Sequence, residues 1–431
     1  MKPGARLKAA VEVLEQSLGR HRPAADALAD WGRAHRFAGS SDRAAIGNLV
    51  YDVMRRRVSL AAEMGADSPR ALVLAAAPRA FALAPEQVAA LADGSEHALA
   101  PLSEAEAKAL GGGLPAGAPD HVRGDYPAWL AASFARAFGE RAAGEGAALA
   151  RRAPVDLRVN GLKATREKVL KALGRFGAKP TPFSPVGVRL AAPEGPGRQP
   201  NVEAEPGHGK GWFEVQDEGS QLAALLAGAG PRQQVLDLCA GAGGKTLAIA
   251  AAMQNTGQIY AYDANRLQLR PIFERLKRAG VRNAQVLAAG EEPALAALGP
   301  RFDVVFIDAP CTGSGVWRRR PDAKWRVKPA QLAERISEQR HVLGLARQLV
   351  KPGGRLVYVT CSVLPEENTD TVAWALAAFP EFRLLPFADV WRGALGSEPP
   401  ASADGCQEAL LLTPGSHGTD GFFIASLARG G

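Results

Sequence analysis

Apolar runs of strand length alternate with helical segments along the second half of the chain, from Trp212 onward. The strand candidates occupy residues 234–239, 258–263, 284–288, 302–308, 354–361 and 421–427. Helical patterns separate them, as over 265–279 and 330–350. Such alternation is typical of a mainly parallel sheet with helices on both faces. This half of the chain is therefore expected to fold as an α/β domain.

The first half of the chain follows other patterns. Residues 1–92 are helical in pattern throughout, with apolar side chains at helical spacing from the start, at Leu7, Val11, Leu14 and Leu18. Residues 93–125 lose this periodicity and gather Gly and Pro, which predicts a linker. A second unit begins near Tyr126 with a helical run and continues with a strand, a helix and a strand at 155–160, 165–177 and 186–192. A chain of 431 residues has room for two or three domains.

The bulk composition indicates a folded protein of a reducing compartment. The chain is 47% hydrophobic and 22% charged, and no stretch approaches the roughly 20 apolar residues that span a bilayer. Its N-terminus lacks the uninterrupted apolar core of a signal peptide. The four cysteines show neither a CxxC pair nor metal-ligand spacing. We therefore expect reduced thiols, a cytoplasmic location and no bound metal.

Positive charge is concentrated in one segment. The formal charge of the chain is +8, and residues 151–189 alone hold ten Lys and Arg against Asp156 and Glu167, an excess of 10 − 2 = +8. A concentrated basic surface favours a polyanion such as nucleic acid through counterion release. Arginine-rich faces that contact only solvent would give the same composition, so charge alone does not decide between the two interpretations.

A glycine-rich turn, CAGAGGKT over 239–246, follows the first strand of the α/β half and opens a helix. Its glycines at 241, 243 and 244 allow close approach to a ligand, and a helix N-terminus favours negative charge. The turn is too short for the GxxxxGK[ST] spacing of phosphate-cradling nucleotidases. Asp263 ends the next strand, where a carboxylate can accept hydrogen bonds from ribose hydroxyls. Turn and acid together predict a nucleoside cofactor, either NAD or S-adenosylmethionine (SAM).

Two cysteines 50 positions apart, Cys311 and Cys361, each close an apolar run. Because the strand ends of an open α/β sheet build its ligand crevice, both thiols and the glycine-rich turn are expected to meet there. Cys361 precedes the sequence PEEN, which predicts a helix start, and a thiolate near a helix N-terminus has a lowered pKa. One of these two thiols is the predicted nucleophile. From the residues alone, Cys239 and Cys406 are interpreted as buried core residues.

The segment GSGVWRRRPDAKWRVK at 313–328 places two tryptophans among six basic residues. Aromatic rings among cations suit stacking on bases and contact with phosphates, which predicts contact with nucleic acid. The alternative interpretation is that Trp317 or Trp325 anchors a hydrophobic core.

Taken together, these motifs resemble those of the Nol/Nop/Sun (Fmu-type) RNA cytosine-C5 methyltransferases, and most closely the bacterial 16S rRNA branch with a NusB-like N-terminal domain. The similar segments extend through most of the chain: HRFAGSSDRAAIGNLVYDVMRRR (35–57), LRVNGLKATREKVLKAL (157–173), GWFEVQDEGSQLAALLA (211–227), LDLCAGAGGKT (236–246), DAPCTGSGVWRRRPDAKW (308–325), YVTCSVLPEEN (358–368) and DGFFIASL (420–427). The DAPC and TCS motifs, in this order after the glycine-rich turn, are the most specific of them.

The resemblance implies a three-part α/β protein. Residues 1–120 would form a helical NusB-like RNA-binding domain, 126–205 a small α+β RNA-binding segment, and 206–431 a Rossmann-like SAM-dependent methyltransferase domain. The expected partner is RNA, with 16S rRNA as the first candidate and other rRNA or tRNA as alternatives. A monomer without membrane contact is expected.

The resemblance also assigns roles to individual residues. Cys361 would attack carbon 6 of cytosine, which makes carbon 5 nucleophilic enough to take a methyl group from SAM, and Cys311 would assist release of the product. Asp308 would stabilise the activated ring where the cofactor and the cytosine meet. The implied cofactor-binding residues are Cys239, Ala240, Gly241, Ala242, Gly243, Gly244, Lys245, Asp263 and Asp308.

One departure from the family pattern concerns the adenine of the cofactor. The family places an acid after the third strand, often in a Gly-Asp pair, whereas this chain reads VLAAGEEPAL over 286–295. Glu291 either replaces that acid or the adenine contact is lost. Three other readings remain in competition: a DNA cytosine methyltransferase, a non-catalytic RNA-binding assembly factor that kept the fold, and an NAD dehydrogenase.

Overall fold

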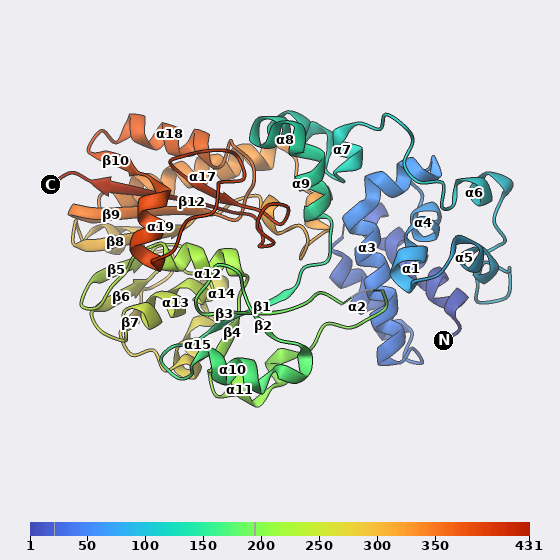
Figure 1. Ribbon diagram of the computed structural model, residues 1–431, viewed down its shortest axis with the longest axis horizontal. Helices are drawn as coiled ribbons and strands as arrows, with labels where there is room; N and C mark the ends of the chain where they lie inside the picture. The colour runs from blue at the N-terminus through green and yellow to red at the C-terminus, as the bar shows by residue number, and fades with distance from the viewer. Residues whose placement is uncertain (21, 194) are drawn as a thin grey trace. The chain divides into compact units, whose positions relative to one another are not determined.

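The computed structural model describes residues 1–20, 22–193 and 195–431, and the chain divides into two compact units (Figure 1). The helical unit comprises Met1–Ala153, Ala192–Gln199 and Trp317–Val327. The α/β unit comprises Pro154–Ala191, Pro200–Val316 and Lys328–Gly431. Among the residues described, no helix has the length and apolar character needed to cross a membrane.

The helical unit is built from nine α-helices within the described ranges: α1 (Pro3–Gly19), α2 (Ala24–Ala34), α3 (Ser40–Met64), α4 (Pro69–Phe81), α5 (Pro85–Leu91), α6 (Glu104–Ala109), α7 (Asp120–Arg123), α8 (Ala131–Phe138) and α9 (Ala142–Leu149). The apolar stripe predicted on the first helix is buried, with Leu7 and Leu14 fully covered. It packs against Ile46, Leu49 and Val53 of α3 in one core. The prediction of a helical N-terminal part is confirmed.

One expectation about the middle of the chain needs correction. The stretch 93–125 is not a structureless linker, because it contains α6 and α7. Ser103 and Glu106 form a capping box at the start of α6, and Arg70 of α4 pairs with Glu106 at 2.7 Å, which fixes this short helix. The helical run predicted after Tyr126 is present as α8, which packs within the helical unit.

Helix α3 is interrupted at Arg56, whose φ of −124° and ψ of 25° are not helical. An interruption frees backbone groups that need other partners. The Ser59 amide, just after the break, donates to the Asp125 carboxylate at 2.8 Å. On the other side of the break, the Met54 and Arg55 carbonyls accept hydrogen bonds from Trp325 Nε1 at 2.6 Å and Lys324 Nζ at 2.7 Å. The segment Trp317–Val327 thereby supplies hydrogen-bond donors to the carbonyl groups beside the break in α3.

For Trp317 the prediction of contact with nucleic acid is wrong. Trp317 is 1% exposed and stacks on Phe134 with ring centroids 6.1 Å apart. Lys324, from the same predicted basic cluster, is also 1% exposed. The alternative interpretation, a core anchor, is therefore correct for Trp317. Trp325 is partly buried against the core of the helical unit, whereas Arg319, Arg320 and Arg326 are exposed.

The α/β unit contains a small antiparallel sheet of order β2-β3-β1-β4. Its elements are β1 (Val155–Val159), α10 (Arg166–Ala172), β2 (Lys179–Pro180), β3 (Gly187–Leu190) and β4 (Phe213–Val215). The predicted strand–helix–strand order at 155–192 is confirmed. Strand β4 pairs with β1 but lies beyond residue 205, so the small sheet extends past the boundary expected from the sequence.

The large sheet has the order β10-β12-β9-β8-β5-β6-β7, with β11 paired to β12. Its strands are β5 (Gln234–Asp237), β6 (Gln258–Ala261), β7 (Ala284–Val286), β8 (Phe302–Asp308), β9 (Val350–Thr360), β10 (Phe382–Leu385), β11 (Leu410–Leu412) and β12 (Phe422–Arg429). The five strands from β5 to β9 pair in parallel, and β12 and β10 are antiparallel. The expected α/β sheet is confirmed, whereas β10 and β11 were not anticipated.

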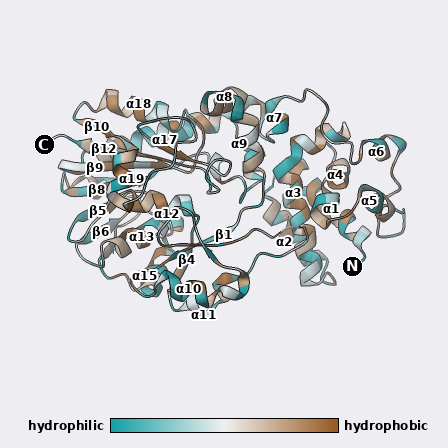
Figure 2. Ribbon diagram, viewed as in Figure 1, coloured by the Kyte–Doolittle hydropathy of each residue, from teal (hydrophilic) through white to brown (hydrophobic). Residues whose placement is uncertain are grey.

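Helices cover both faces of the large sheet, with α17 and α18 on one face and α12, α13 and α15 on the other (Figure 1). The helices of this part are α12 (Glu218–Leu225), α13 (Gly244–Ala252), α14 (Arg266–Leu269), α15 (Ile272–Ala279), α16 (Glu292–Ala296), α17 (Pro329–Arg347), α18 (Thr369–Ala378) and α19 (Phe387–Leu395). Hydrophobic residues run along the strands between these layers (Figure 2). The strand order reverses between β5 and β8, and open α/β sheets bind ligands at such a switch point.

Candidate active site

The predicted site residues lie at the carboxyl ends of neighbouring parallel strands, three of which carry the turn and the thiols, while Asp263 follows a fourth, β6. The glycine-rich turn follows β5, Asp308 ends β8, and Cys361 comes directly after β9. Strand β8 pairs with β5 on one side and with β9 on the other. The three loops therefore meet at the switch point of the large sheet, as the sequence predicted.

The glycine-rich turn needs its glycines for two separate reasons. Gly241 and Gly243 have φ of 49° and 82°, in the left-handed region that favours glycine. A Cβ on Gly243 would also lie 2.4 Å from Cγ1 of Ile272, so the turn packs directly onto α15. Helix α13 begins at Gly244, which leaves its first amides at this end of the sheet.

Two carboxylates hold the turn in place through hydrogen bonds. Asp263 accepts hydrogen bonds from the Gly241 amide at 2.9 Å and the Asn265 amide at 2.7 Å. Asp237, at the end of β5, accepts one from the Thr246 hydroxyl at 2.6 Å. Burial raises the pKa of Asp237 to about 7. Its other oxygen is buried and has no hydrogen-bond partner among the described residues, so polar capacity remains beside the turn for a bound molecule.

The two predicted thiols are in direct contact. Sγ of Cys311 lies 3.3 Å from Sγ of Cys361, and both residues are partly exposed. The hydrogen bond with Cys361 and burial together raise the pKa of the Cys311 thiol. Cys406 lies outside this group, between α19 and β11, and is partly exposed, so its interpretation as a buried core residue is wrong.

An ion pair lies beside the thiols. Lys245 of α13 donates to Asp308 at 2.5 Å, and its side chain is 10% exposed. Burial acts to lower the pKa of Lys245, but the hydrogen-bonded carboxylate of Asp308 outweighs it and raises the pKa. Lys245 thus stays an ammonium group beside Cys361.

The helix expected at PEEN is not there. Residues 365–368 form turns, and α18 begins only at Thr369. The prediction that a helix N-terminus activates Cys361 is therefore wrong. Lys245 of α13, rather than a helix end, is the positively charged group beside Cys361.

Sequence reasoning missed a buried carboxylate that holds the DAPC loop. Both oxygens of Glu367 accept hydrogen bonds from Thr312, one from the amide at 2.8 Å and one from the hydroxyl at 2.5 Å. Gln339 of α17 donates to Glu367 at 3.1 Å and to the Pro310 carbonyl at 2.9 Å. Burial raises the pKa of Glu367. The second glutamate of PEEN was the available signal, but it was interpreted only as part of a helix start.

The two cysteine loops are also bonded to each other. The Gly315 amide donates to the Cys361 carbonyl at 2.9 Å, and the hydroxyls of Ser314 and Ser362 are 2.9 Å apart. A Cβ on Gly315 would lie 2.3 Å from the Gly421 carbonyl oxygen, so this close crossing requires glycine. These contacts fix the separation of the thiols from both sides.

Glu291, the candidate replacement for the adenine-contacting acid, is exposed and immediately precedes α16. Its neighbour Glu292 contacts His341 at 3.1 Å. Tyr262, adjacent to Asp263, has a buried hydroxyl without a hydrogen-bond partner in the described part of the chain. Burial raises the pKa of Tyr262, and the charges of Glu292 and Glu291, near this end of β6, add to the effect.

Comparison with known proteins agrees with this geometry. Residues 224–428 match the family model of the 16S rRNA methyltransferases RsmB/F, and residues 126–195 match the ferredoxin-like domain of the RsmF/B-like methyltransferases. A probable ribosomal RNA small subunit methyltransferase B from Synechocystis is 32% identical over 308 residues, which are 70% of this chain and 67% of the relative. The crystal structure of a methyltransferase homologue from Pyrococcus horikoshii is 30% identical with a TM-score of 0.59, covering 72% of this chain and 97% of that one.

The chain belongs to the RsmB/F methyltransferase family. The structure of NSun6 from Pyrococcus horikoshii with SFG, at 23% identity and a TM-score of 0.62, shows the same fold over 70% of this chain and 98% of that one. RsmB/F proteins are SAM-dependent RNA cytosine-C5 methyltransferases, so SAM and not NAD is the cofactor of the glycine-rich turn. The family resemblance stated from the motifs is confirmed, and so is the order of a helical part, a small α+β segment and a mixed-sheet methyltransferase part.

The residues present fit this cofactor in an RsmB/F protein. The tight turn at Gly243, the open start of α13 and the partner-free oxygen of Asp237 lie together at the end of β5. The residues that would surround it are those of the turn, 239–245, with Asp263 at one side and Asp308 at the other.

Proposed function

We propose that this protein methylates carbon 5 of a cytosine in 16S rRNA through a covalent bond between Cys361 and carbon 6 of the base. The contact of the two thiols beside the Lys245–Asp308 ion pair is the observation that carries this proposal. A single cysteine at a strand end is common in protein cores, whereas two that touch next to a buried ammonium group need a chemical explanation.

Cys361 is the proposed nucleophile. Its thiolate, beside the ammonium group of Lys245, attacks carbon 6 and forms a carbon–sulfur bond. The electron pair of the ring double bond moves toward carbon 5 and the ring nitrogen, and the Asp308–Lys245 pair stabilises the charge on the ring. SAM, held by residues 239–245, would supply an electrophilic methyl group to carbon 5, and its sulfur–methyl bond would break to leave S-adenosylhomocysteine.

Cys311 is the proposed release group. Its pKa is raised chiefly by Cys361, so the formation of the carbon–sulfur bond removes that effect and makes Cys311 more acidic. Cys311 then loses its proton to water and accepts the proton of carbon 5. The carbon–sulfur bond breaks, the ring double bond is restored, and Cys361 leaves as a thiolate.

The remaining parts of the chain serve substrate binding in this proposal. Residues 1–120 and the small α+β segment at 126–205 bind RNA, and 206–431 carry the cofactor and the thiols. The basic stretch 151–189, with its local excess of +8, supports contact with a polyanion. The match to a family named for 16S rRNA and the small-subunit name of the Synechocystis relative support rRNA as the target over tRNA.

The decisive experiment compares RNA from a deletion strain with wild type by bisulfite sequencing of total RNA. We expect one 16S rRNA cytosine to lose its methyl group in the deletion strain and to regain it when the purified protein acts on the deletion-strain RNA with SAM. Loss of a methyl group only in tRNA or 23S rRNA would overturn the target. Transfer to duplex DNA, assayed in parallel, would favour the DNA methyltransferase reading.

The exposed position of Glu291 is the one observation that favours a second function, a non-catalytic assembly factor. In that case the protein would bind RNA but not SAM. Titration calorimetry with SAM separates the two, because an enzyme of this type must bind its cofactor measurably.

A further inference from the structure

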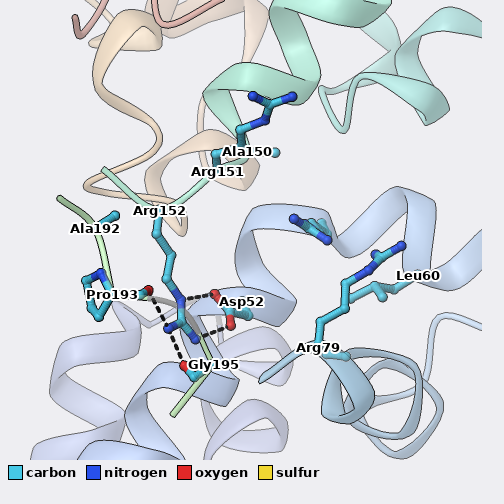
Figure 3. Close-up of a pocket in the computed structure, with 11 residues that line it drawn as sticks. Asp52, Leu60, Arg79, Ala150, Arg151, Arg152, Ala192, Pro193 and Gly195 are labelled. Atoms are coloured by element: carbon cyan, nitrogen blue, oxygen red, sulfur yellow. Dashed lines mark hydrogen bonds and ion pairs between the residues drawn. The ribbon is translucent and has the colours of Figure 1, made fainter. Parts of the chain in front are cut away.

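The helical unit contains a cavity of about 400 Å³, within the size range of small-ligand sites. It is lined by four arginines, one aspartate and a set of apolar residues: Asp52, Arg56, Leu60, Ala76, Arg79, Ala150, Arg151, Arg152, Ala192, Pro193 and Gly195 (Figure 3). Neither the catalytic thiols nor the cofactor turn belong to this unit. The cavity therefore contains none of the residues proposed to carry out the methyl transfer.

Two of the charged residues, Arg152 and Asp52, form an ion pair with each other. Arg152 forms two hydrogen bonds to Asp52, at 3.1 and 2.5 Å, and a further one to the Gly195 carbonyl at 2.5 Å (Figure 3). Asp52 also pairs with Arg55 at 3.0 Å. The only carboxylate that lines this cavity among the described residues is thus already shared by two guanidinium groups.

The other three arginines have no such partner. Arg56, Arg79 and Arg151 make no ion pair or side-chain hydrogen bond within the described ranges. Figure 3 shows Arg79 and Arg151 without a contact among the residues drawn. Burial and the positive charges of Arg79 and Arg151 lower the pKa of Arg56, against the opposite effect of Asp52 and Asp125. In the cavity the arginines outnumber the single lining carboxylate, and clustered cations favour an anion between them.

A second cavity, of about 530 Å³, shares Arg152 and Pro193 with the first. Three further arginines line it, namely Arg55, Arg198 and Arg319. Basic side chains therefore continue from one cavity into the next, on both sides of the Arg152–Asp52 pair. A single small anion would fill one cavity, whereas a chain of phosphates can follow both.

We propose that Arg56, Arg79 and Arg151 bind a backbone phosphate of the RNA substrate, and that the adjoining cavity receives the next part of the same strand. The identity of the polyanion as RNA rests on the proposed function. Guanidinium groups suit this task because their planar forks donate paired hydrogen bonds to phosphate oxygens and stay charged. The site recognises the negative charge of the RNA backbone and does not distinguish between bases.

Filter binding of a full-length 16S rRNA transcript at several salt concentrations tests the proposal. The test protein is Arg79→Gln/Arg151→Gln, because both side chains are exposed and the fold should persist. The control is Arg20→Gln/Arg36→Gln, which removes two exposed charges from the same unit but lines neither cavity. We expect the test variant to bind on the order of tenfold more weakly at moderate salt, with a salt slope smaller by about one, and the control to match wild type.

Equal binding by the test and control variants would overturn the proposal. So would unchanged RNA binding together with loss of stabilisation by inorganic phosphate in a thermal melt, which would assign the cavity to a free anion. The methyl-transfer assay distinguishes this failure from failure of the function. If wild type methylates 16S rRNA and both variants bind alike, only the arginine site is wrong. If wild type methylates nothing while the test variant alone loses RNA binding, only the enzymatic proposal is wrong.

Discussion

The two charged regions of this protein are organised in opposite ways. At the switch point of the α/β unit, the charged side chains beside the thiols are paired: Lys245 forms an ion pair with Asp308, and Glu367 accepts hydrogen bonds from Thr312 and Gln339. In the cavity of the helical unit, three arginines have no partner among the described residues. Catalysis benefits from groups fixed in advance, whereas binding a polyanion requires charge left free for it. Substitutions should therefore affect turnover in the first region and affinity in the second.

The largest effect is expected for the nucleophile. Cys361→Ala removes the only group proposed to form the bond to carbon 6, so methyl transfer from labelled SAM should fall to background. RNA affinity should stay within about twofold of wild type, because this part of the site does not hold the strand. Cys406→Ala is the matched control and should retain full activity. Appreciable turnover by Cys361→Ala would remove the covalent step from the account.

A smaller loss of turnover is expected when a substitution disturbs the charged groups around the thiols but leaves both thiols in place. Glu367→Gln brings an amide N–H against the Thr312 donors, and the DAPC loop should shift. Misplacement of a reacting group by about 1 Å can cost roughly 100-fold in rate, so kcat should fall by about 10- to 100-fold with KM for RNA little changed. Glu334→Gln, on the exposed face of α17, is the control. A rise in KM with unchanged kcat would contradict the positioning role.

The sequence predicted the catalytic region better than the helical one. Strand ends and glycine turns are local features, so the positions of Gly243, Asp308 and Cys361 followed from apolar runs and turn residues. Glu367 was missed because its role depends on Thr312, which is distant in sequence and adjacent only in the fold. The role of Trp325 was missed because its partner, the Met54 carbonyl at the break in α3, is distant in sequence. In the sequence alone, a tryptophan among cations gives the same pattern in both roles.

A further prediction concerns how Lys324, which bonds to α3 at its break, makes the free energy of unfolding depend on pH. Burial, aided by Arg55 and Arg56, lowers the pKa of Lys324 to about 7, below its value of about 10.4 in an unfolded chain. Between pH 7 and 10 the unfolded chain binds a proton that the folded chain has lost, so Lys324 contributes stability that increases as the pH rises. The unfolding free energy lost in Lys324→Met should grow across this window, by at most about 1.4 kcal/mol per pH unit.

Urea denaturation followed by tryptophan fluorescence at pH 7, 8 and 9 checks this expectation. Lys328→Met, an exposed lysine nearby in sequence, is the control and should show no such trend. A loss that is constant with pH would mean that Lys324 keeps its proton throughout and acts only through its hydrogen bonds to the Arg55 and Asp125 carbonyls.

The smallest effect is expected at the cofactor site. Glu291 is exposed, so a contact with the adenine would be a single solvent-accessible hydrogen bond. Glu291→Ala should weaken SAM binding in titration calorimetry by no more than about tenfold, given the roughly 1 kcal/mol typical of such a bond. Identical affinities for wild type and variant would exclude Glu291 from the site and leave the adenine without an acidic contact.

The central claim is the division of labour between the two touching thiols, and trapping of the covalent intermediate tests it most directly. Cys311→Ala should still attack the base and accept the methyl group, but release should be slow. Incubated with 16S rRNA and SAM, this variant is predicted to give a slow-migrating protein–RNA band on a denaturing gel. The double variant Cys311→Ala/Cys361→Ala should give none. Absence of the band from Cys311→Ala with an RNA that wild type methylates, or its persistence in the double variant, would contradict the account.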